Sequence, residues 1–200
     1  MHLDLLDWRR RVGALYAEIR STGDPRRAHE RWRATRDALL GTHPQSPIPE
    51  ESRRRFTGVP VAPYDPAFRF EVTLDAGVEA CRLDVPTGTD GVVRLDRIGR
   101  IILPELGSLD AWWVGGYGGG LFLPVRDATA GITTYGGGRY VLDTIKGADL
   151  GGRDGRLVVD LNFAYNPSCA YDPMWACPLA PPGNVLAIPV TAGELLTFGE

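Results

Sequence analysis

The side chains best suited to chemistry are concentrated in the carboxy-terminal half of the chain. Asp160 and Asn162 stand two positions apart in an apolar run, so on a strand both would project from the same face. A buried carboxylate and amide need polar partners, and the guanidinium of Arg139 is the natural partner for Asp160. This pattern fits either a structural ion pair between two strands or a substrate-binding site.

The segment after this run carries further reactive groups. Asn166 precedes a proline, which favours a turn, and loops after strands often hold functional side chains. Cys169 lies in the same segment and is a candidate nucleophile, for which His43 is the most suitable base among the histidines. The alternative for Cys169 is a buried, inert thiol, and a bridge to Cys177 is expected only in an oxidising setting.

Hydrolysis, isomerisation or elimination would each suit a pocket built from these groups. In such a pocket Asp160 or Asp127 transfers a proton and Asn162 holds a carbonyl group. Tyr165 serves as an acid or hydrogen-bond donor, and Arg139 orients an anionic group of the substrate. The other side chains expected to bind substrate are Tyr135, Asn166 and His43.

Other chemistries have weaker support. Cys169 and Cys177 lack the spacing of a zinc site, and no carboxylate-dense calcium loop occurs, so no metal is predicted. The run Gly136-Gly137-Gly138 lacks the lysine and hydroxyl ending of a phosphate-binding loop, so a tight turn is favoured over an anion site at Arg139. Lys146 is the only lysine and hence the only candidate for a Schiff base. No organic cofactor is predicted.

Two amphipathic helices are predicted before a β-rich remainder. Residues 1–41 carry apolar side chains three or four positions apart, interrupted at Asp24-Pro25, which predicts a helical hairpin. Residues 42–67 form a proline-rich linker. From residue 68 onward short alternating apolar runs lie between turn residues. Strands are expected around residues 68–74, 80–85, 92–96, 100–103, 111–114, 121–125, 139–142, 157–163 and 185–190.

These elements predict one domain over residues 1–200, of the α+β class and mostly β. Residues 68–200 form the β core, an antiparallel barrel or sandwich, with the motif-rich region at 123–184. The amino-terminal hairpin must pack its apolar stripe against this core.

Composition narrows the classes of partner. A net charge of −3 argues against a nucleic-acid binder, which needs a surplus of basic residues. No apolar run approaches the roughly 18 residues of a membrane span, and no signal peptide is seen, so a cytoplasmic protein without a membrane partner is expected. The expected partner is a small molecule, with an anionic group suited to Arg139, and the sequence leaves a homo-oligomer open.

Two runs of motifs resemble a known family. The first joins Thr133-Thr134-Tyr135 to Gly138-Arg139-Tyr140, and the second comprises Asp160-Leu161-Asn162, Ala164-Tyr165-Asn166-Pro167, Cys169-Ala170-Tyr171 and Cys177-Pro178-Leu179. With Trp32, Arg36, Asp37 and the segment from His43 to Pro47, they resemble the bacterial DUF1684 family, a domain of unknown function. Leu161 and Ala180 depart from its phenylalanine and proline, changes that concern packing more than chemistry. The resemblance implies a shared fold and site, and transfers no activity.

Two functions from different classes therefore remain. The first is a small-molecule enzyme of hydrolase, isomerase or lyase type without an organic cofactor. The second is a non-catalytic ligand-binding or interaction module, in which the aspartates, arginine and tyrosines form a polar core and the loops recognise the ligand. A phosphopeptide binder of the forkhead-associated type is suggested only by Arg97-Ile98-Gly99-Arg100.

Overall fold

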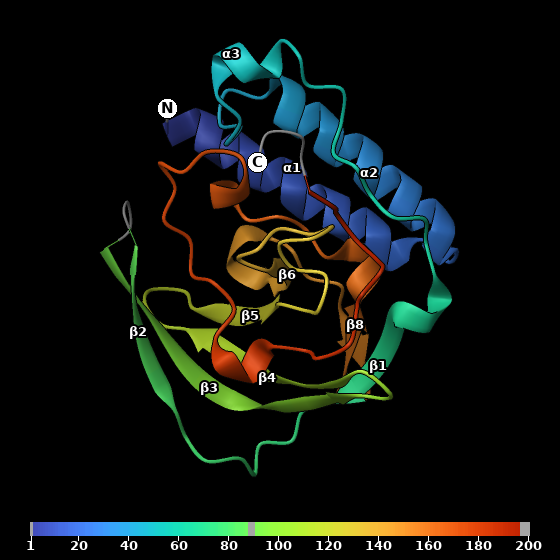
Figure 1. Cartoon of the computed structure of the whole chain (residues 1–200), viewed down its shortest axis with the longest axis vertical. Coiled ribbons are helices and arrows are strands. Elements are labelled where there is room, and N and C mark those ends of the chain that lie inside the picture. The colour runs from blue at the N-terminus through green and yellow to red at the C-terminus, as the bar shows by residue number, and fades with distance from the viewer. Residues whose placement is uncertain (1, 88–90, 197–200) are drawn as a thin grey trace.

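The computed structural model describes residues 2–87 and 91–196. Helices α1 (His2–Ser21) and α2 (Pro25–Thr42) form the predicted hairpin and lie together on one side of the molecule (Figure 1). Asp24 caps α2, since its Oδ1 accepts a hydrogen bond of 2.9 Å from the backbone N–H of Arg26. No helix in the described part of the chain has the length and apolar character needed to span a membrane.

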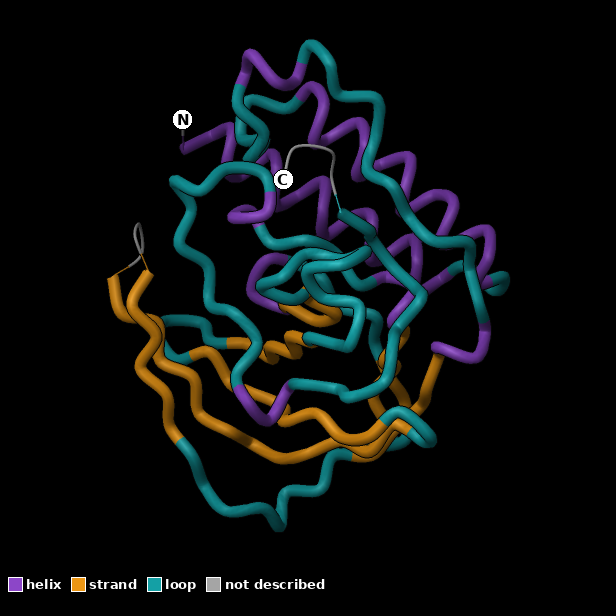
Figure 2. Tube along the Cα trace, in the orientation of Figure 1, coloured by secondary structure: helices purple, strands orange, loops and turns teal. Residues whose placement is uncertain are grey.

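The linker after the hairpin is extended for most of its length. It contains one short helix, α3 (Glu50–Arg53), and ends in the 3₁₀ turn η1 (Pro66–Phe68). The three prolines before α3 prevent α2 from continuing. Figure 2 shows helices on one side, strands on the other and long loops between them.

The strands form two antiparallel sheets. The larger sheet has five strands in the order β2-β3-β4-β5-β6, and the smaller has three in the order β1-β8-β7. Neither closes into a barrel among the residues described, so the fold agrees with the sandwich alternative. The strands are β1 (Arg69–Thr73), β2 (Arg82–Thr87), β3 (Gly91–Leu103), β4 (Gly107–Val114), β5 (Gly120–Val125), β6 (Arg139–Asp143), β7 (Gly152–Arg153) and β8 (Arg156–Asp160).

Four predicted strands differ from the structure. The two expected at 92–96 and 100–103 are one strand, β3, with a bulge between Arg97 and Gly99. The strand expected at 157–163 ends at Asp160, because residues 161–163 form the 3₁₀ turn η3 (Leu161–Phe163). The segment 185–190 is no strand, and its ladder is reduced to one bridge between Arg126 and Val185.

Arg97 and Arg100, which suggested phosphopeptide binding, hold a buried carboxylate instead. Arg97 Nη1 lies 3.0 Å from Asp110 Oδ2, and Arg100 Nε lies 2.7 Å from Asp110 Oδ1. Both arginines therefore already have a protein partner, and the pair joins neighbouring strands β3 and β4.

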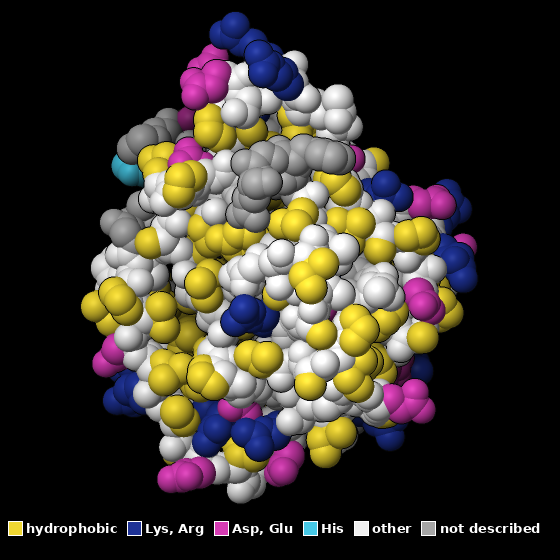
Figure 3. Space-filling view, viewed as in Figure 1, with side chains coloured by type: hydrophobic (Ala, Val, Ile, Leu, Met, Phe, Trp, Pro, Cys, Tyr) yellow, Lys and Arg dark blue, Asp and Glu magenta, His cyan; other side chains and the backbone are white. Residues whose placement is uncertain are grey.

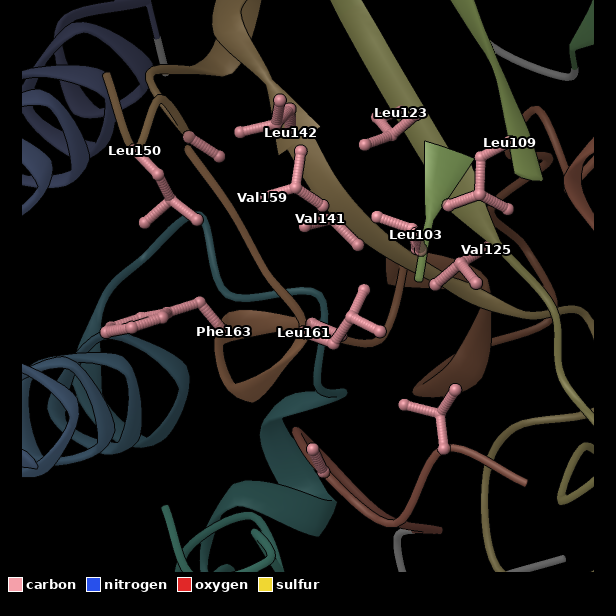
Figure 4. Close-up of a cluster of buried hydrophobic side chains, with 14 of the residues drawn as sticks. Leu103, Leu109, Leu123, Val125, Val141, Leu142, Leu150, Val159, Leu161 and Phe163 are labelled. Atoms are coloured by element: carbon pink, nitrogen blue, oxygen red, sulfur yellow. The ribbon is translucent and has the colours of Figure 1, made fainter. Parts of the chain in front are cut away.

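The main hydrophobic core lies between the helices and both sheets. From the hairpin it takes Leu15, Ile19 and Trp32, of which Trp32 is fully buried. Figure 4 shows aliphatic side chains of the strands pointing toward one another, with Phe163 between them and the helices. The labelled strand and turn residues are Leu103, Leu109, Leu123, Val125, Val141, Leu142, Leu150, Val159 and Leu161. The core thus covers the apolar stripe from Leu15 onward, whereas Leu5 at the start of α1 is 37% exposed.

The outer surface mixes residue types. On the face in Figure 3, hydrophobic side chains are scattered among polar atoms, while Lys, Arg, Asp and Glu side chains lie mainly toward the rim. Charges of both signs are present there, in keeping with the small net charge of −3.

His29 joins α2 to the turn after β8. Its ring stacks on Trp32 at 5.5 Å between centroids and meets the edge of Phe163 at the same distance. Its Nε2 donates to the backbone carbonyl of Asn162 at 3.0 Å. Burial of the ring lowers the pKa of His29 from 6.5 to about 4.

This burial predicts a pH-dependent contribution to stability. Unfolded chains take up a proton on His29 as the pH falls through 6.5, whereas the folded protein does so only near 4. Between these values the unfolded state binds more protons, so the free energy of unfolding decreases as the pH falls. His29→Gln keeps an N–H donor for the carbonyl of Asn162 but cannot titrate. As the pH falls, the free energy of unfolding of this variant should therefore decrease less than that of the wild type.

Urea unfolding at pH 7 and pH 5 measures this difference. The matched control is His2→Gln, since His2 is exposed at the start of α1. An equal decrease in the wild type and in His29→Gln would show that His29 does not contribute.

Candidate functional site

Arg139 pairs with Asp127 rather than with Asp160, which corrects the expected pairing. Arg139 Nη2 lies 2.8 Å from Asp127 Oδ2, and neither side chain is more than 1% exposed. The guanidinium also donates to the carbonyls of Val190, Ala192 and Glu194. Asp127 Oδ1 accepts from Val190 N–H at 3.1 Å.

The turn before β6 explains why this arginine is buried. Gly138 has a φ of +89°, and a Cβ there would lie 2.7 Å from the carbonyl oxygen of Val125. Only glycine suits that conformation and that close approach, and the turn directs Arg139 into the interior. Asp127 completes its own set of partners with the backbone N–H and hydroxyl of Thr129, at 2.9 and 2.6 Å. The Asp127–Arg139 pair is thus a buried structural contact, although Nε of Arg139 is buried without a hydrogen-bond partner in the described structure.

Asp160 and Asn162 form a cap instead of a shared strand face. Asp160 Oδ1 accepts from the backbone N–H of Asn162 at 3.0 Å and from its Nδ2 at 2.7 Å, and Oδ2 accepts from Tyr64 Oη at 3.2 Å. Asn162 in turn binds the backbone N–H and carbonyl of Asp65, both at 2.8 Å. These hydrogen bonds hold the end of β8 to the linker. Burial of the carboxyl group raises the pKa of Asp160.

A groove beside this cap contains several arginines. It is open, has a volume of about 390 Å³ and is lined by Asp160 and by apolar residues of α1 and β8. Its charged rim comprises Arg20, Arg69, Glu71, Arg153 and Arg156. Arg69 is already bound to Glu71, with Nη1 and Oε1 3.1 Å apart.

Glu194 is the centre of another buried network, one that joins α2 to the loop after β8. Its Oε1 lies 2.5 Å from Arg36 Nε, and its Oε2 accepts from Asn166 N–H at 2.7 Å and from Tyr171 Oη at 3.3 Å. The Glu194 side chain is 1% exposed and that of Arg36 15%. Burial opposes the charge of Arg36, but the carboxylate raises the pKa of Arg36 above its ordinary value.

A small cavity lies next to this network, between the helical hairpin and the loop after β8. Its volume is about 90 Å³, and we call it the tyrosine cavity. The guanidinium of Arg36 lies 4.7 Å from the ring centre of Tyr165. The aromatic and polar lining comprises Tyr16, Arg36, Tyr140, Tyr165, Asn166 and Tyr171.

Asp143 and Lys146 add charge to the tyrosine cavity. Asp143 ends β6 and is 5% exposed, and its Oδ2 lies 3.7 Å from Lys146 Nζ. Burial raises the pKa of Asp143, so this carboxyl group holds its proton to higher pH than a free aspartic acid does. Asn166, which also lines the cavity, has a buried Oδ1 without a hydrogen-bond partner in the described structure.

Of the remaining predicted residues, Tyr135 and Cys169 lie together, and His43 lies against the first helix. Tyr135 Oη is 3.5 Å from Cys169 Sγ, so these two meet. His43 is buried against α1, with Nε2 3.2 Å from Asp7 Oδ2 and its ring 5.2 Å from that of Trp8. The linker therefore holds His43 against the first helix, where Asp7 and Trp8 are its partners.

The predicted residues thus occupy several places rather than one hollow. Tyr165 and Asn166 line the tyrosine cavity, Asp160 lines the arginine-rimmed groove, and Asp127 and Arg139 are sealed in the interior. No group of three or more His, Cys, Asp or Glu side chains that could hold a metal occurs among the described residues.

The comparisons with known proteins agree with this fold. The model of a family described as a protein of unknown function, DUF1684, matches residues 54–195. The chain belongs to the DUF1684 family. It is 35% identical to the uncharacterised protein from gene locus rrnAC0354 of Haloarcula marismortui, known from a solution NMR structure. The match covers 82% of this chain and 89% of that one, with a TM-score of 0.58. No curated protein matches the chain.

The DUF1684 motifs meet at the tyrosine cavity. Tyr140 belongs to the first motif run, and Tyr165, Asn166, Pro167 and Tyr171 belong to the second. The two runs are held together by backbone hydrogen bonds of 2.8 and 2.9 Å between Tyr140 and Tyr165. The cavity is therefore the place where residues distant in the sequence converge in this family member.

Three residues of this site escaped the sequence reasoning. Asp143 directly follows the strand predicted at 139–142 and belongs to neither motif run, and Lys146 was considered only for a Schiff base. Glu194 lies near the carboxy terminus, where the apolar residues follow neither the helical nor the strand periodicity. Its one local signal is Gly193, whose φ is +78° and where a Cβ would lie 2.6 Å from the carbonyl oxygen of Ala164.

The buried Asp127–Arg139 pair predicts a large effect on stability. Arg139→Met removes the charge that balances Asp127 and should cost about 3 to 5 kcal/mol, or roughly 6 to 20 °C in Tm. The matched control is Arg126→Met, at an exposed position directly after β5, which should change Tm little. A scanning calorimetry result with both variants near the wild type would contradict the structural role of the pair.

Proposed function

We propose that the protein binds a compact, polar small molecule in the tyrosine cavity and catalyses a proton-transfer reaction on it. The reaction would be of hydrolase, isomerase or lyase type and would need no organic cofactor. A volume of about 90 Å³ has room for roughly six water-sized groups, so the bound part of the ligand is small.

The observation that carries this proposal is the environment of Asp143. Asp127 and Asp160 are satisfied by several short hydrogen bonds, whereas the one ion pair described for the Asp143 side chain, to Lys146, is 3.7 Å long. Lys146 also gives this carboxyl group a backbone and a side-chain hydrogen bond, but burial still raises its pKa. A buried carboxyl group with a raised pKa beside a cavity is suited to donate or accept a proton.

Two residues that line the cavity would form polar contacts with a ligand. The partnerless Oδ1 of Asn166 would accept a hydrogen bond from an N–H or O–H group of the ligand. The side chain of Lys146 is 59% exposed and lines the cavity, so an anionic ligand group would lie near its ammonium. The tyrosine rings would cover the apolar faces of the ligand.

The second candidate function is a non-catalytic ligand-binding module. The buried networks around Arg139, Asp160 and Glu194 favour it, because these groups already serve the protein as structural contacts. Both candidates place the ligand in the same cavity, and they differ in whether Asp143 changes the ligand chemically.

Asp143→Asn tests the catalytic proposal. Ligands are first found by saturation-transfer NMR with a panel of small polar metabolites, and product formation is then followed by NMR. Loss of proton transfer should reduce turnover by about 100- to 10,000-fold while binding persists. The control is Asp84→Asn, at an exposed position on the edge strand β2.

The pH profile distinguishes the two candidate functions. If Asp143 donates the proton, turnover decreases as the pH rises through the raised pKa of Asp143, and that limb is absent from the variant. A ligand that is bound but never converted supports the binding module. If no ligand contacts the cavity, both functions are wrong.

A further inference from the structure

The arginine-rimmed groove beside Asp160 plays no part in the proposed function. It lies where the turn between α1 and α2 meets strands β1 and β8, whereas the tyrosine cavity contacts the earlier part of α1 (Figure 1). From α1, Ile19 and Arg20 line the groove, while Trp8 and Tyr16 line the cavity. The two are therefore separate hollows beside the same helix.

Strand alternation explains why charged side chains gather on this side of the small sheet. On β8, Arg156, Val158 and Asp160 stand two positions apart and therefore project from one face. Arg69 and Glu71 of β1 are cross-strand partners of this row and share its face. The alternate residues of both strands pack into the main hydrophobic core, so the groove takes the charged face of the sheet.

The β7–β8 hairpin places two arginines directly opposite each other. Arg153 and Arg156 are cross-strand partners on either side of the two-residue turn Asp154-Gly155. The φ values of this turn are +52° and +73°, and a tight hairpin turn of this kind needs a positive φ at both central residues. Side chains directly opposite each other lie on one face, with Cβ atoms about 4.5 to 5.5 Å apart. The turn therefore holds the two arginines together at the rim of the groove.

The protein does not balance the charges of this arginine pair. Within residues 2–87 and 91–196, neither the Arg153 nor the Arg156 side chain forms an ion pair or a hydrogen bond. Like charges directly opposite each other destabilise a sheet. An anion bound between the two guanidinium groups would remove that repulsion, so the pair suits a ligand better than it suits the stability of the hairpin.

The carboxylates of the groove are already occupied by the protein. Glu71 binds Arg69 at 3.1 Å, and the Asp160 carboxyl group is held in its cap. Arg20 of α1 donates from Nη1 to the backbone carbonyl of Asp149 at 2.6 Å, and its Nη1 lies 3.8 Å from the carboxylate of the same residue. Four arginines and two acidic residues line the groove, so its net charge is positive.

The buried part of the lining is apolar. Ile19, Ala28, Leu150 and Phe163 belong to the main core, and none is more than 8% exposed. A volume of about 390 Å³ lies within the range of roughly 300 to 1,000 Å³ that small-molecule pockets occupy. Such pockets combine an apolar lining with a few charged groups that orient the ligand.

We propose that this groove binds a phosphorylated small molecule with an apolar body. A phosphate monoester carries about two negative charges near neutral pH, which matches the two unpaired guanidinium groups of Arg153 and Arg156. Planar guanidinium groups bind phosphate oxygens through paired N–H donors. Arg20 adds a further positive charge, and Ile19 and Phe163 contact the apolar body.

Titration of the full chain with phenyl phosphate, followed by backbone amide NMR at constant ionic strength, tests the site. The expected result is saturable binding with shifts at Thr22, Gly151 and Gly152, which line the groove. Shifts confined to residues of the tyrosine cavity, such as Ser168, would overturn the proposal, and so would the absence of saturable shifts.

Two double variants separate the arginine pair from the net charge of the protein. Arg153→Gln with Arg156→Gln should raise the Kd for phenyl phosphate at least about 10-fold, because charge-assisted hydrogen bonds are lost. Arg10→Gln with Arg55→Gln removes the same charge at exposed positions outside the groove and should leave the Kd nearly unchanged. An equal Kd in the two double variants would contradict a specific role for the pair.

Simpler probes test each half of the ligand. Inorganic phosphate should bind at the same residues more weakly than phenyl phosphate, because it lacks the ring that contacts the apolar lining. Phenol should not bind there, because it lacks the charge. Inorganic phosphate that binds as tightly as phenyl phosphate would contradict the apolar contact, and phenol that does so would contradict the role of the arginines.

Thermal unfolding checks the charge repulsion and guards against a misfolded variant. The Tm of the Arg153→Gln, Arg156→Gln double variant should be no lower than that of the wild type, since the like charges are gone. Phenyl phosphate should raise the Tm of the wild type more than that of this variant in the same buffer. An equal rise in both would contradict the site. None of these results depends on Asp143, so this site and the proposed function can fail separately.

Discussion

The ion pair between Arg36 and Glu194 is the contact on which the rest of the site depends. Through Glu194 it joins α2 to the loop after β8, because the same carboxylate binds the N–H of Asn166 and the hydroxyl of Tyr171. Through Arg36 it sets one wall of the tyrosine cavity, since the guanidinium stacks on Tyr165. A charge buried this deeply needs its partner, so the helical hairpin and the cavity are held together as one unit.

Three buried aspartates show how surroundings separate structural from chemical roles. Asp127 is saturated by an arginine, a threonine and a backbone N–H, and Asp160 caps a turn. Asp143 has Lys146 as its partner, with Oδ2 and Nζ 3.7 Å apart, and lies beside a cavity. Groups whose hydrogen bonds are all made within the protein have little capacity left for a ligand, so we place the proposed chemistry at Asp143, which lines the cavity and has a raised pKa.

Local sequence patterns predicted the helices and strands better than they predicted the side-chain contacts between them. The helical hairpin followed from apolar spacing and from Asp24-Pro25, signals that act within a few residues. The strand expected through Asn162 was wrong because Asp160 caps a turn, which alternation of apolar residues cannot reveal. The partner of Arg139 and the role of Glu194 depend on contacts between distant segments, and no spacing rule encodes those.

An experimental crystal structure of the protein, purified without added ligands, tests the central claim most directly. The account predicts an open cavity bounded by Arg36, Asp143 and Asn166, with non-protein density in contact with the carboxyl group of Asp143. A structure in which Tyr165 and Tyr171 fill this space, so that the carboxyl group of Asp143 borders no cavity, would contradict this prediction.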